Sequence, residues 1–341
     1  MTPEEAGAPA ARGGAGIGPL PARVAVVGGA GFIGSHLVEL LAADGINVLV
    51  VDDLSHPCGT PLPASVELVE ADAGGTEAAT ALVRFRPQAL VHLAAKGGVN
   101  RALRDPGDHV RRVLASSVAC FEAAARAGCE ALLIASSGGA VYGDAARLPA
   151  SEELTPSPRS AYGAEKLCEE TYLWTYRQRG LRTVALRYGN VYGPRQDGTG
   201  EAGVVAISST RLAQGQRPVI YGDGSQTRDF VYVADIAAAT RAALASAIDG
   251  PVNVGTGRET SVLEVVDGLI AAAGGGITPD FQPARAGEVA RACLDAGRAE
   301  RLLGWKPQTA LADGLALAHR HFVAQIARTT PAGGRPAIKG R

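Results

Sequence analysis

The stretch that decides the fold is residues 23–37, which read RVAVVGGAGFIGSHL. A short apolar run ends at Gly28, and two further glycines follow at three-residue intervals, Gly31 and Gly34. The first glycine permits a tight turn, the second lets the backbone approach a pyrophosphate, and the third lets a helix pack on the strand. Because free N–H groups at a helix start bind phosphate, this stretch predicts a dinucleotide site on a strand–turn–helix unit.

Acidic residues follow at the ends of the next two apolar runs. The run Asn47–Val51 leads into Asp52 and Asp53. Asp52 can accept hydrogen bonds from both hydroxyls of the adenosine ribose, and its charge would repel a 2′-phosphate. Since no arginine follows directly, NAD is favoured over NADP. Asp53 is the second candidate. Asp72 is a candidate acceptor for the adenine amino group, although a turn-forming aspartate is equally ordinary there.

Apolar runs alternate with helical patterns along the first half of the chain. Continuous apolar strands of this kind are typical of a buried parallel sheet with helices on both faces. The fold class is therefore α/β, a Rossmann-type doubly wound parallel sheet. The expected strands are Arg23–Gly28, Asn47–Val51, Val66–Glu70, Ala89–Leu93, Ala131–Ser136 and Thr183–Arg187, and the expected helices lie near 76–86, 107–127 and 160–179.

Composition changes divide the chain into four parts. Residues 1–22 are rich in Ala, Gly and Pro and are expected to be a disordered lead. Residues 23–189 form the expected NAD-binding domain. Residues 190–327 form mainly a smaller α/β substrate-binding domain, with some segments returning to the first domain. Residues 328–341 are expected to be a flexible tail.

Charge and cysteine usage limit the function classes. The 33 basic and 34 acidic side chains balance, which argues against nucleic acid or an acidic membrane as a general partner. No apolar run reaches the roughly 18 residues of a membrane span, and no secretory signal is expected. The five cysteines have no metal-ligand spacing, so no metal site is expected. Cys120, Cys129 and Cys168 are expected to be small buried thiols in helices, and the protein is expected to be cytoplasmic.

Tyr162 and Lys166 lie four residues apart in a predicted helix, which puts both on one face. Tyrosine, with a pKa of about 10, is a poor base near neutrality. A neighbouring ammonium, together with the positive nicotinamide ring, lowers that pKa and stabilises the phenolate. The alternative is an ordinary surface pair. Ser136 and Ser137 end the preceding strand, where a hydroxyl could hold the reacting oxygen of a substrate beside Tyr162 or simply cap the strand.

With these residues assembled, the sequence resembles the extended short-chain dehydrogenase/reductases, and most of all their UDP-glucose 4-epimerase branch. The resemblance covers about residues 23–325. The matching stretches are the glycine motif, 51–54 (VDDL), 92–95 (HLAA), 136–143 (SSGGAVYG), Tyr162 with Lys166, 187–196 (RYGNVYGPRQ), 221–224 (YGDG), 228–230 (RDF) and 285–288 (RAGE).

The resemblance implies roles at matching positions. The cofactor would contact Phe32, Ile33, Leu54, Ala73, Leu93, Ala94, Ala95 and Lys96 besides the residues above, with Tyr188 beside the nicotinamide amide. The nucleotide diphosphate and sugar would contact Ser137, Gly138, Asn190, Gly203, Val204, Tyr221, Arg228, Arg285, Glu288 and Ala292. Two arginines can clamp a diphosphate, and an aromatic ring can pack on uracil. Two alternatives stay open: Tyr188 is a core residue, and Arg228 pairs with Asp229.

Several positions depart from the family pattern. Gly138 stands where Ser or Thr is usual, and Ser137 is the candidate replacement. Val113 stands where the family has Asn in its long helix, Ala102 replaces a usual Ser, and Lys96 replaces a common Gln. These departures surround the expected position of the reacting sugar.

The sequence-based hypothesis is an NAD-dependent UDP-sugar 4-epimerase that acts on UDP-glucose and UDP-galactose or on N-acetylated forms through a transient 4-keto sugar. The alternatives are dehydration, decarboxylation or net oxidation, and a non-catalytic NAD-binding module. Gly139 and Ala140 argue against a dehydratase, which usually carries Asp-Glu there. By resemblance, the helices near 107–127 and 160–179 pair in a homodimer, and Ala292, four positions after Glu288, leaves room for an N-acetyl group.

Overall fold

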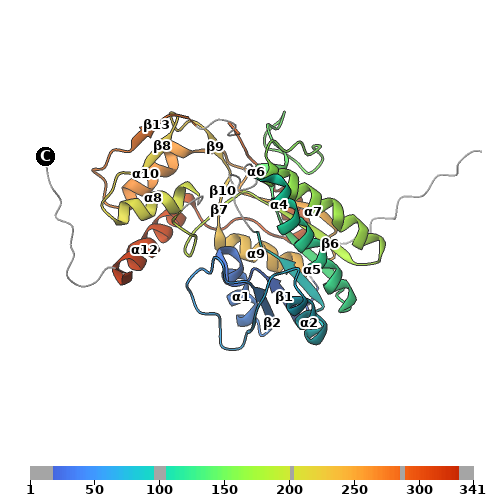
Figure 1. Ribbon diagram of the computed structural model, residues 1–341. Helices are drawn as coiled ribbons and strands as arrows, with labels where there is room; N and C mark the ends of the chain where they lie inside the picture. Colours follow the sequence, from blue (N-terminus) through green and yellow to red (C-terminus); the bar gives the residue numbers. More distant parts are fainter. Residues whose placement is uncertain (1–17, 96–104, 200–202, 285–288, 330–341) are drawn as a thin grey trace, which may run out of the picture.

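The computed structural model describes residues 18–95, 105–199, 203–284 and 289–329 (Figure 1). A central sheet of seven strands has the order β11-β6-β5-β4-β1-β2-β3, and every pairing in it is parallel. Its strands, in chain order, are β1 (Arg23–Val27), β2 (Asn47–Asp52), β3 (Glu67–Glu70), β4 (Ala89–His92), β5 (Ala131–Ser137), β6 (Arg182–Tyr188) and β11 (Gly250–Val254).

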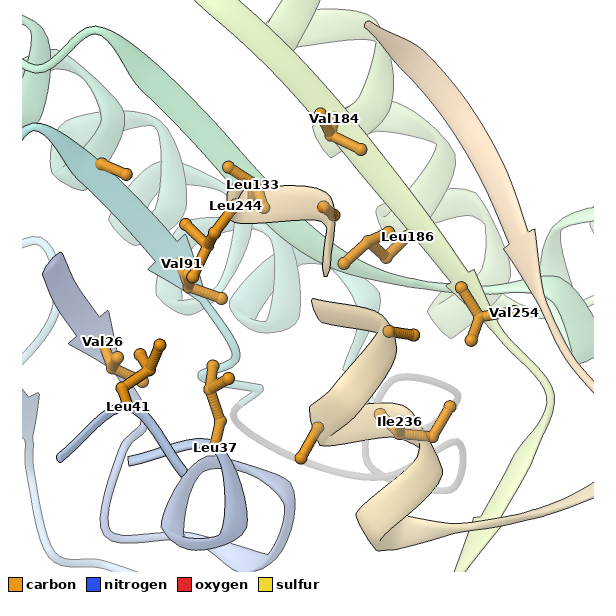
Figure 2. Packing of buried hydrophobic residues seen from close by; sticks show 14 of the residues in the cluster. Val26, Leu37, Leu41, Val91, Leu133, Val184, Leu186, Ile236, Leu244 and Val254 are labelled. Atoms are coloured by element: carbon orange, nitrogen blue, oxygen red, sulfur yellow. The ribbon is translucent and has the colours of Figure 1, made fainter. Parts of the chain in front are cut away.

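The inner strands are apolar on both sides because both faces of the sheet are covered. Residues 24–27 of β1, 48–51 of β2 and 89–92 of β4 are all buried. On one face, α1 (Phe32–Ala43) and α9 (Val233–Leu244) pack on Val26, Val91 and Leu133 (Figure 2), and α11 (Gly297–Leu303) packs beside β11 and α9. On the other, α2 (Thr76–Phe85), α5 (Leu114–Arg126) and α7 (Ala161–Gln178) pack on residues such as Leu132 and Ile134.

A smaller unit follows β6 and has its own apolar cluster, which includes Val205, Ile220, Val265 and Leu315. In Figure 1 its helices gather on the side of the molecule away from α2. It contains α8 (Val204–Ala213), α10 (Val262–Ala272), α12 (Leu311–Thr329) and the short strands β7 (Asn190–Tyr192), β8 (Val219–Tyr221), β9 (Thr227–Arg228), β10 (Phe230–Tyr232), β12 (Thr260–Ser261) and β13 (Asp280–Gln282).

The predicted fold class is confirmed: the sheet is parallel, doubly covered and accompanied by a smaller α/β unit. The seventh strand, β11, comes from beyond residue 190 and pairs with β6. Among the described residues, no helix is long and apolar enough to cross a membrane.

Three local features differ from or refine the expectations. Residues 18–22 are not part of a disordered lead, because the Gly18 N–H donates to Ala245 and Leu20 packs on the core. The helical stretch expected near 107–127 is confirmed, but it is divided into α4 (Pro106–Arg112) and α5, which meet at Val113. Cys120 and Cys129 are buried as expected, but Cys168 is exposed because it lies on the outer face of α7.

Candidate active site

The turn between β1 and α1 has no room for side chains, as the glycine motif predicts. Gly28 has a φ of +80°, and a Cβ there would lie 2.6 Å from the Ala94 nitrogen. A Cβ on Gly34 would lie 2.1 Å from the Gly28 carbonyl oxygen. Within the described residues, no side chain caps the first turn of α1, which begins at Phe32. The turn therefore offers bare backbone N–H groups to a phosphate.

A cavity of about 700 Å³ opens at this turn. Loop residues 195–199 and Gln325 and Ile326 of α12 also line it. Among the predicted cofactor residues, those that line it are Gly28, Gly31, Phe32, Ile33, Gly34, Asp52, Asp53, Ala73, Leu93, Ala94 and Ala95. Leu54, Asp72, Tyr162, Lys166 and Tyr188 do not line it, and Lys96 lies outside the described residues.

The aspartates after the strands have distinct partners. The Asp52 carboxylate accepts from the N–H groups of Ala30 and Leu54, both at 2.9 Å, so it is fixed at the cavity wall. The Asp72 carboxylate accepts from the Gly74 N–H and from the Ser116 hydroxyl, both at 2.9 Å. Asp72 therefore has the turn-forming geometry that the sequence left as its alternative.

Tyr162 and Lys166 lie on the same face of α7, as their spacing predicts. The Lys166 Nζ is 6.0 Å from the centre of the Tyr162 ring. The hydroxyls of Tyr162 and Ser137 are hydrogen-bonded, which brings the carboxyl end of β5 to the start of α7. The structure thus brings a hydroxyl, a phenol and an ammonium together.

Burial raises the pKa of Tyr162 above its ordinary value, while Lys166 and the hydrogen bond from Ser137 act in the opposite direction. The protein alone therefore favours the neutral phenol. A positive charge from the oxidised nicotinamide ring would stabilise the phenolate, so base strength is coupled to the bound cofactor.

Two predicted site residues face elsewhere. The Ser136 hydroxyl bonds to Glu170 of α7, whereas the Ser137 hydroxyl bonds to Tyr162, two turns earlier on the same helix. Tyr188 is a core residue: its hydroxyl lies 2.7 Å from Thr240 Oγ1, within the cluster between the sheet and α9. The structure therefore places the Ser136 hydroxyl against Glu170 and the Tyr188 side chain in the core.

Gly138 departs from the family pattern because its neighbour fills the space. A Cβ on Gly138 would lie 2.5 Å from a terminal methyl carbon of Leu294. Leu294 is buried against Val141, Tyr142 and Ala150. A side chain at 138 thus competes with Leu294, and the hydroxyl that reaches Tyr162 comes from Ser137 instead.

The predicted substrate residues lie around the small unit. The Asn190 N–H donates to the Asp229 carbonyl at 2.6 Å, and its side-chain oxygen faces Gly139. Helix α8 begins at Val204 after Gly203, and no described side chain caps its first turn. That helix start has the same bare N–H groups as the start of α1.

Tyr221 ends β8 and Arg228 ends β9, and two further predicted substrate residues follow β13 in the sequence. Arg285 and Glu288 lie outside the described residues. The described chain on either side is held in place, since the Gly222 N–H donates to Gln282 and the Thr227 N–H donates to Ala290. The Ala292 N–H also donates to Thr227. The Asp229 carboxylate binds Thr256, Gly257 and Leu294.

Sequence reasoning missed a buried polar cluster beneath the active site. Arg187 of β6 forms an ion pair with Glu170 of α7 at 2.6 Å and donates to the Tyr142 hydroxyl at 2.8 Å. Tyr142 in turn donates to Asn253 of β11 at 2.9 Å. The cluster joins β6, α7 and β11. Only Arg187 and Glu170 are near enough in the sequence for their pairing to be suggested by it. Within the ranges described, no group of three or more His, Cys, Asp or Glu side chains could hold a metal ion.

This combination of fold, glycine turn and Ser–Tyr–Lys unit defines a dinucleotide-binding protein of the extended short-chain dehydrogenase/reductase class. The model of the "NAD dependent epimerase/dehydratase family" matches residues 24–255, and the chain belongs to that family. Its cofactor is NAD.

Relatives span nearly the whole described chain. It is 42% identical over 301 residues to a UDP-glucose 4-epimerase of Mycolicibacterium smegmatis, covering 86% of this chain and 96% of that protein. The UDP-glucose 4-epimerase of Thermus thermophilus, solved with NAD, is 40% identical with a TM-score of 0.83, covering 88% and 98%. That of Thermotoga maritima, solved with UDP-glucose, is 36% identical with a TM-score of 0.85, covering 89% and 99%.

The contact between Gly138 and Leu294 can be tested by a double-mutant cycle. We expect Gly138→Ser to lower the free energy of unfolding by about 1–3 kcal/mol, because the new side chain overpacks against Leu294. Leu294→Ala alone should cost about 2–5 kcal/mol through the cavity it leaves. The double variant should lose less than the sum of the two, as measured by urea unfolding. Strictly additive losses would show that the two positions do not compete for space.

Proposed function

We propose that the protein is an NAD-dependent UDP-sugar 4-epimerase, an isomerase of nucleotide sugars. The observation that carries this proposal is the Ser137–Tyr162–Lys166 unit at the carboxyl edge of a sheet whose glycine turn fits a dinucleotide. NAD, when bound, supplies reversible hydride transfer at carbon 4 of the sugar. The protein supplies the proton chemistry and holds the rest of the substrate.

Tyr162 takes the proton of the sugar 4-hydroxyl as the 4-keto sugar forms. It returns that proton after the 4-keto sugar has rotated in the site to present its other face. Ser137 holds the sugar oxygen beside Tyr162 through its hydroxyl. Lys166 keeps a positive charge near the phenolate. NAD is regenerated in each cycle, so the overall reaction consumes no second substrate.

The small unit has groups suited to a nucleoside diphosphate. The free helix start at Val204 and the guanidinium of Arg228 can bind phosphate oxygens. The Tyr221 ring, at the end of β8, is partly exposed and can pack on uracil. Arg285, Glu288 and Ala292 complete the proposed substrate set, and the small Ala292 side chain leaves space for an N-acetyl group.

Two alternative functions have less support. A dehydratase would need acids after the serines, but α6 (Gly138–Val141) starts with Gly138, Gly139 and Ala140 and has no acid in its first turn. A non-catalytic NAD-binding module would not need the hydrogen-bonded Ser137 and Tyr162 pair. All five cysteines are free thiols, which fits the proposed cytoplasmic location.

The proposal predicts interconversion of UDP-glucose and UDP-galactose, and activity on UDP-N-acetylglucosamine, when products are separated by chromatography. Tyr162→Phe should lower kcat at least ~100-fold, because the ring remains but the proton acceptor is lost. NAD binding should persist in the variant. A protein that releases no epimer from any UDP-hexose, or a Tyr162→Phe variant with near-normal turnover, would contradict the proposal.

The two serines should differ in the same assay. We expect Ser137→Ala to lower kcat about tenfold, since it removes a hydrogen bond to the reacting group. Ser136→Ala should lower kcat less, because its hydroxyl bonds Glu170, two turns along α7 from Tyr162. The opposite order would assign the positioning role to Ser136.

We also propose a homodimer. The outer surface of the α4, α5 and α7 region carries exposed apolar side chains such as Val110 and Tyr172, and burial of such surface stabilises association. Light scattering at micromolar concentration should give twice the chain mass. An introduced charge, Tyr172→Glu, should shift the population toward monomer, whereas Val83→Glu on α2 should not. A strictly monomeric wild type would contradict this proposal.

A further inference from the structure

Lys166 is held by two buried glutamates that the mechanism above does not use. Its ammonium donates to Glu169 Oε2 at 2.8 Å and lies 3.7 Å from Glu165 Oε1. The side chain of Lys166 is 3% exposed and that of Glu169 is 0% exposed. Water therefore screens this ion pair very little.

Each glutamate has a second anchor on a different helix. The Ser117 hydroxyl of α5 donates to Glu169 Oε1 at 2.6 Å. His109 of α4 contacts Glu165 Oε2 through its Nε2. Because α4 and α5 pack beside α7, these contacts fix the direction from which the carboxylates approach Lys166.

The charge of Glu169 opposes the charge of Lys166 at Tyr162. Although burial alone would raise the pKa of Glu169, Lys166 and the Ser117 hydrogen bond outweigh it and keep the pKa below its usual value, so Glu169 is ionised. Burial is the largest cause of the raised pKa of Tyr162; Lys166 lowers that pKa, and Glu165 and Glu169 raise it.

The other groups that face this pair carry less charge. His92 of β4 is buried, and its pKa falls to about 4 because burial disfavours the cation, so it is neutral. Among the described residues, the titratable or polar groups that surround Tyr162, Lys166 and the two glutamates include His92, His109, Ser117 and Ser137.

Stability does not account for a buried ion pair of this kind. Removing two charges from water costs several kcal/mol, and well-packed apolar residues in their place are often neutral or stabilising. The pair is better explained by control of the position and charge of Lys166.

We propose that Glu169 is a positioning residue that, with Ser117, holds the Lys166 ammonium beside Tyr162 and sets the pH at which Tyr162 becomes a base. This inference rests on the proposed function, since it assumes that Tyr162 carries the proton in catalysis. Glu169 acts through Lys166 and does not itself touch the substrate.

The test is the pH profile of Glu169→Gln. Its amide oxygen can accept from Lys166 while its NH₂ group donates to Ser117, so the packing is retained and only the charge is lost. Removal of a nearby negative charge stabilises the phenolate and lowers the pKa of Tyr162. The acid limb of kcat/KM for UDP-glucose should therefore move to lower pH by about one unit. The plateau of kcat should fall, because a weaker base accepts the proton less readily.

Glu130→Gln is the matched control. Glu130 is exposed and precedes β5, whereas Ser137 ends that strand, so the same chemical change occurs far from Lys166. Its pH profile should coincide with that of the wild type. A Glu169→Gln profile that also coincides with the wild type would overturn the proposal.

A second variant tests positioning without a change of charge. Ser117→Ala removes one anchor of Glu169 and should lower kcat several-fold, with the KM for UDP-glucose and the acid limb unchanged. The proposal would be overturned if kcat did not change, or if the acid limb of the kcat/KM profile moved as far as it does in Glu169→Gln. This variant also provides the test if Glu169→Gln does not fold.

A spectroscopic titration separates this inference from the proposed function. The ultraviolet difference between each protein and its Tyr162→Phe counterpart, in the presence of NAD, reports the Tyr162 phenolate without any turnover. The midpoint should be lower in Glu169→Gln than in the wild type. If the midpoint of the Tyr162 titration shifts but the protein has no epimerase activity, only the proposed function is contradicted. If the protein is active but the midpoint does not move, only the inference is contradicted.

Discussion

The structure depends on the close approach of three backbone segments around Gly28. The β1 turn, the start of α1 and the end of β4 meet there, and the carbonyl of Gly28 lies where a side chain on Gly34 would be. Because β1 pairs with both β2 and β4, this contact also fixes where their carboxyl ends lie. The same absence of side chains that allows the contact leaves the N–H groups of α1 open toward the cavity.

A second constraint holds the catalytic edge of the sheet. The Arg187–Glu170 ion pair ties β6 to α7. Hydrogen bonds from Arg187 to the Tyr142 hydroxyl, and from that hydroxyl to the Asn253 amide oxygen, connect β6 to β11. Since Tyr162 lies two turns before Glu170 on α7, the cluster fixes the helix that carries Tyr162 and Lys166. The glycine turn after β1 and helix α7 are thus anchored by different contacts, on opposite sides of β4.

The sheet and the cofactor turn could be predicted from local sequence because their signals are local. Continuous apolar runs indicate buried parallel strands, and the glycine spacing indicates the turn. The four-residue spacing of Tyr162 and Lys166 likewise places both on one helix face. These features require only the periodicity of a single element.

Other site features could not be predicted because they depend on which face of an element is covered. Arg187 and Tyr188 point to opposite faces of β6, because side chains alternate along a strand. Ser136 and Ser137 both bond to α7, but to residues two turns apart. The sequence alone does not say which of these neighbouring side chains meets the ligand. Leu294 is 156 residues from Gly138, so nothing local links a missing side chain to the one that fills its space. Glu169 was accessible in principle, since it is three residues from Lys166, but its burial comes from α5.

The departures from the family pattern are consistent with one another. Leu294 occupies the space beside Gly138, and the adjacent Ser137 provides the hydroxyl at Tyr162. Val113, which stands where the family has a polar side chain, is buried at the junction of α4 and α5. The polar partners of this region are instead Ser117 on α5 and His109 on α4, and they bind the two glutamates around Lys166. The polar environment of Tyr162 therefore comes from neighbouring positions: Ser137 provides a hydroxyl beside the phenol, and buried carboxylates lie beside Lys166.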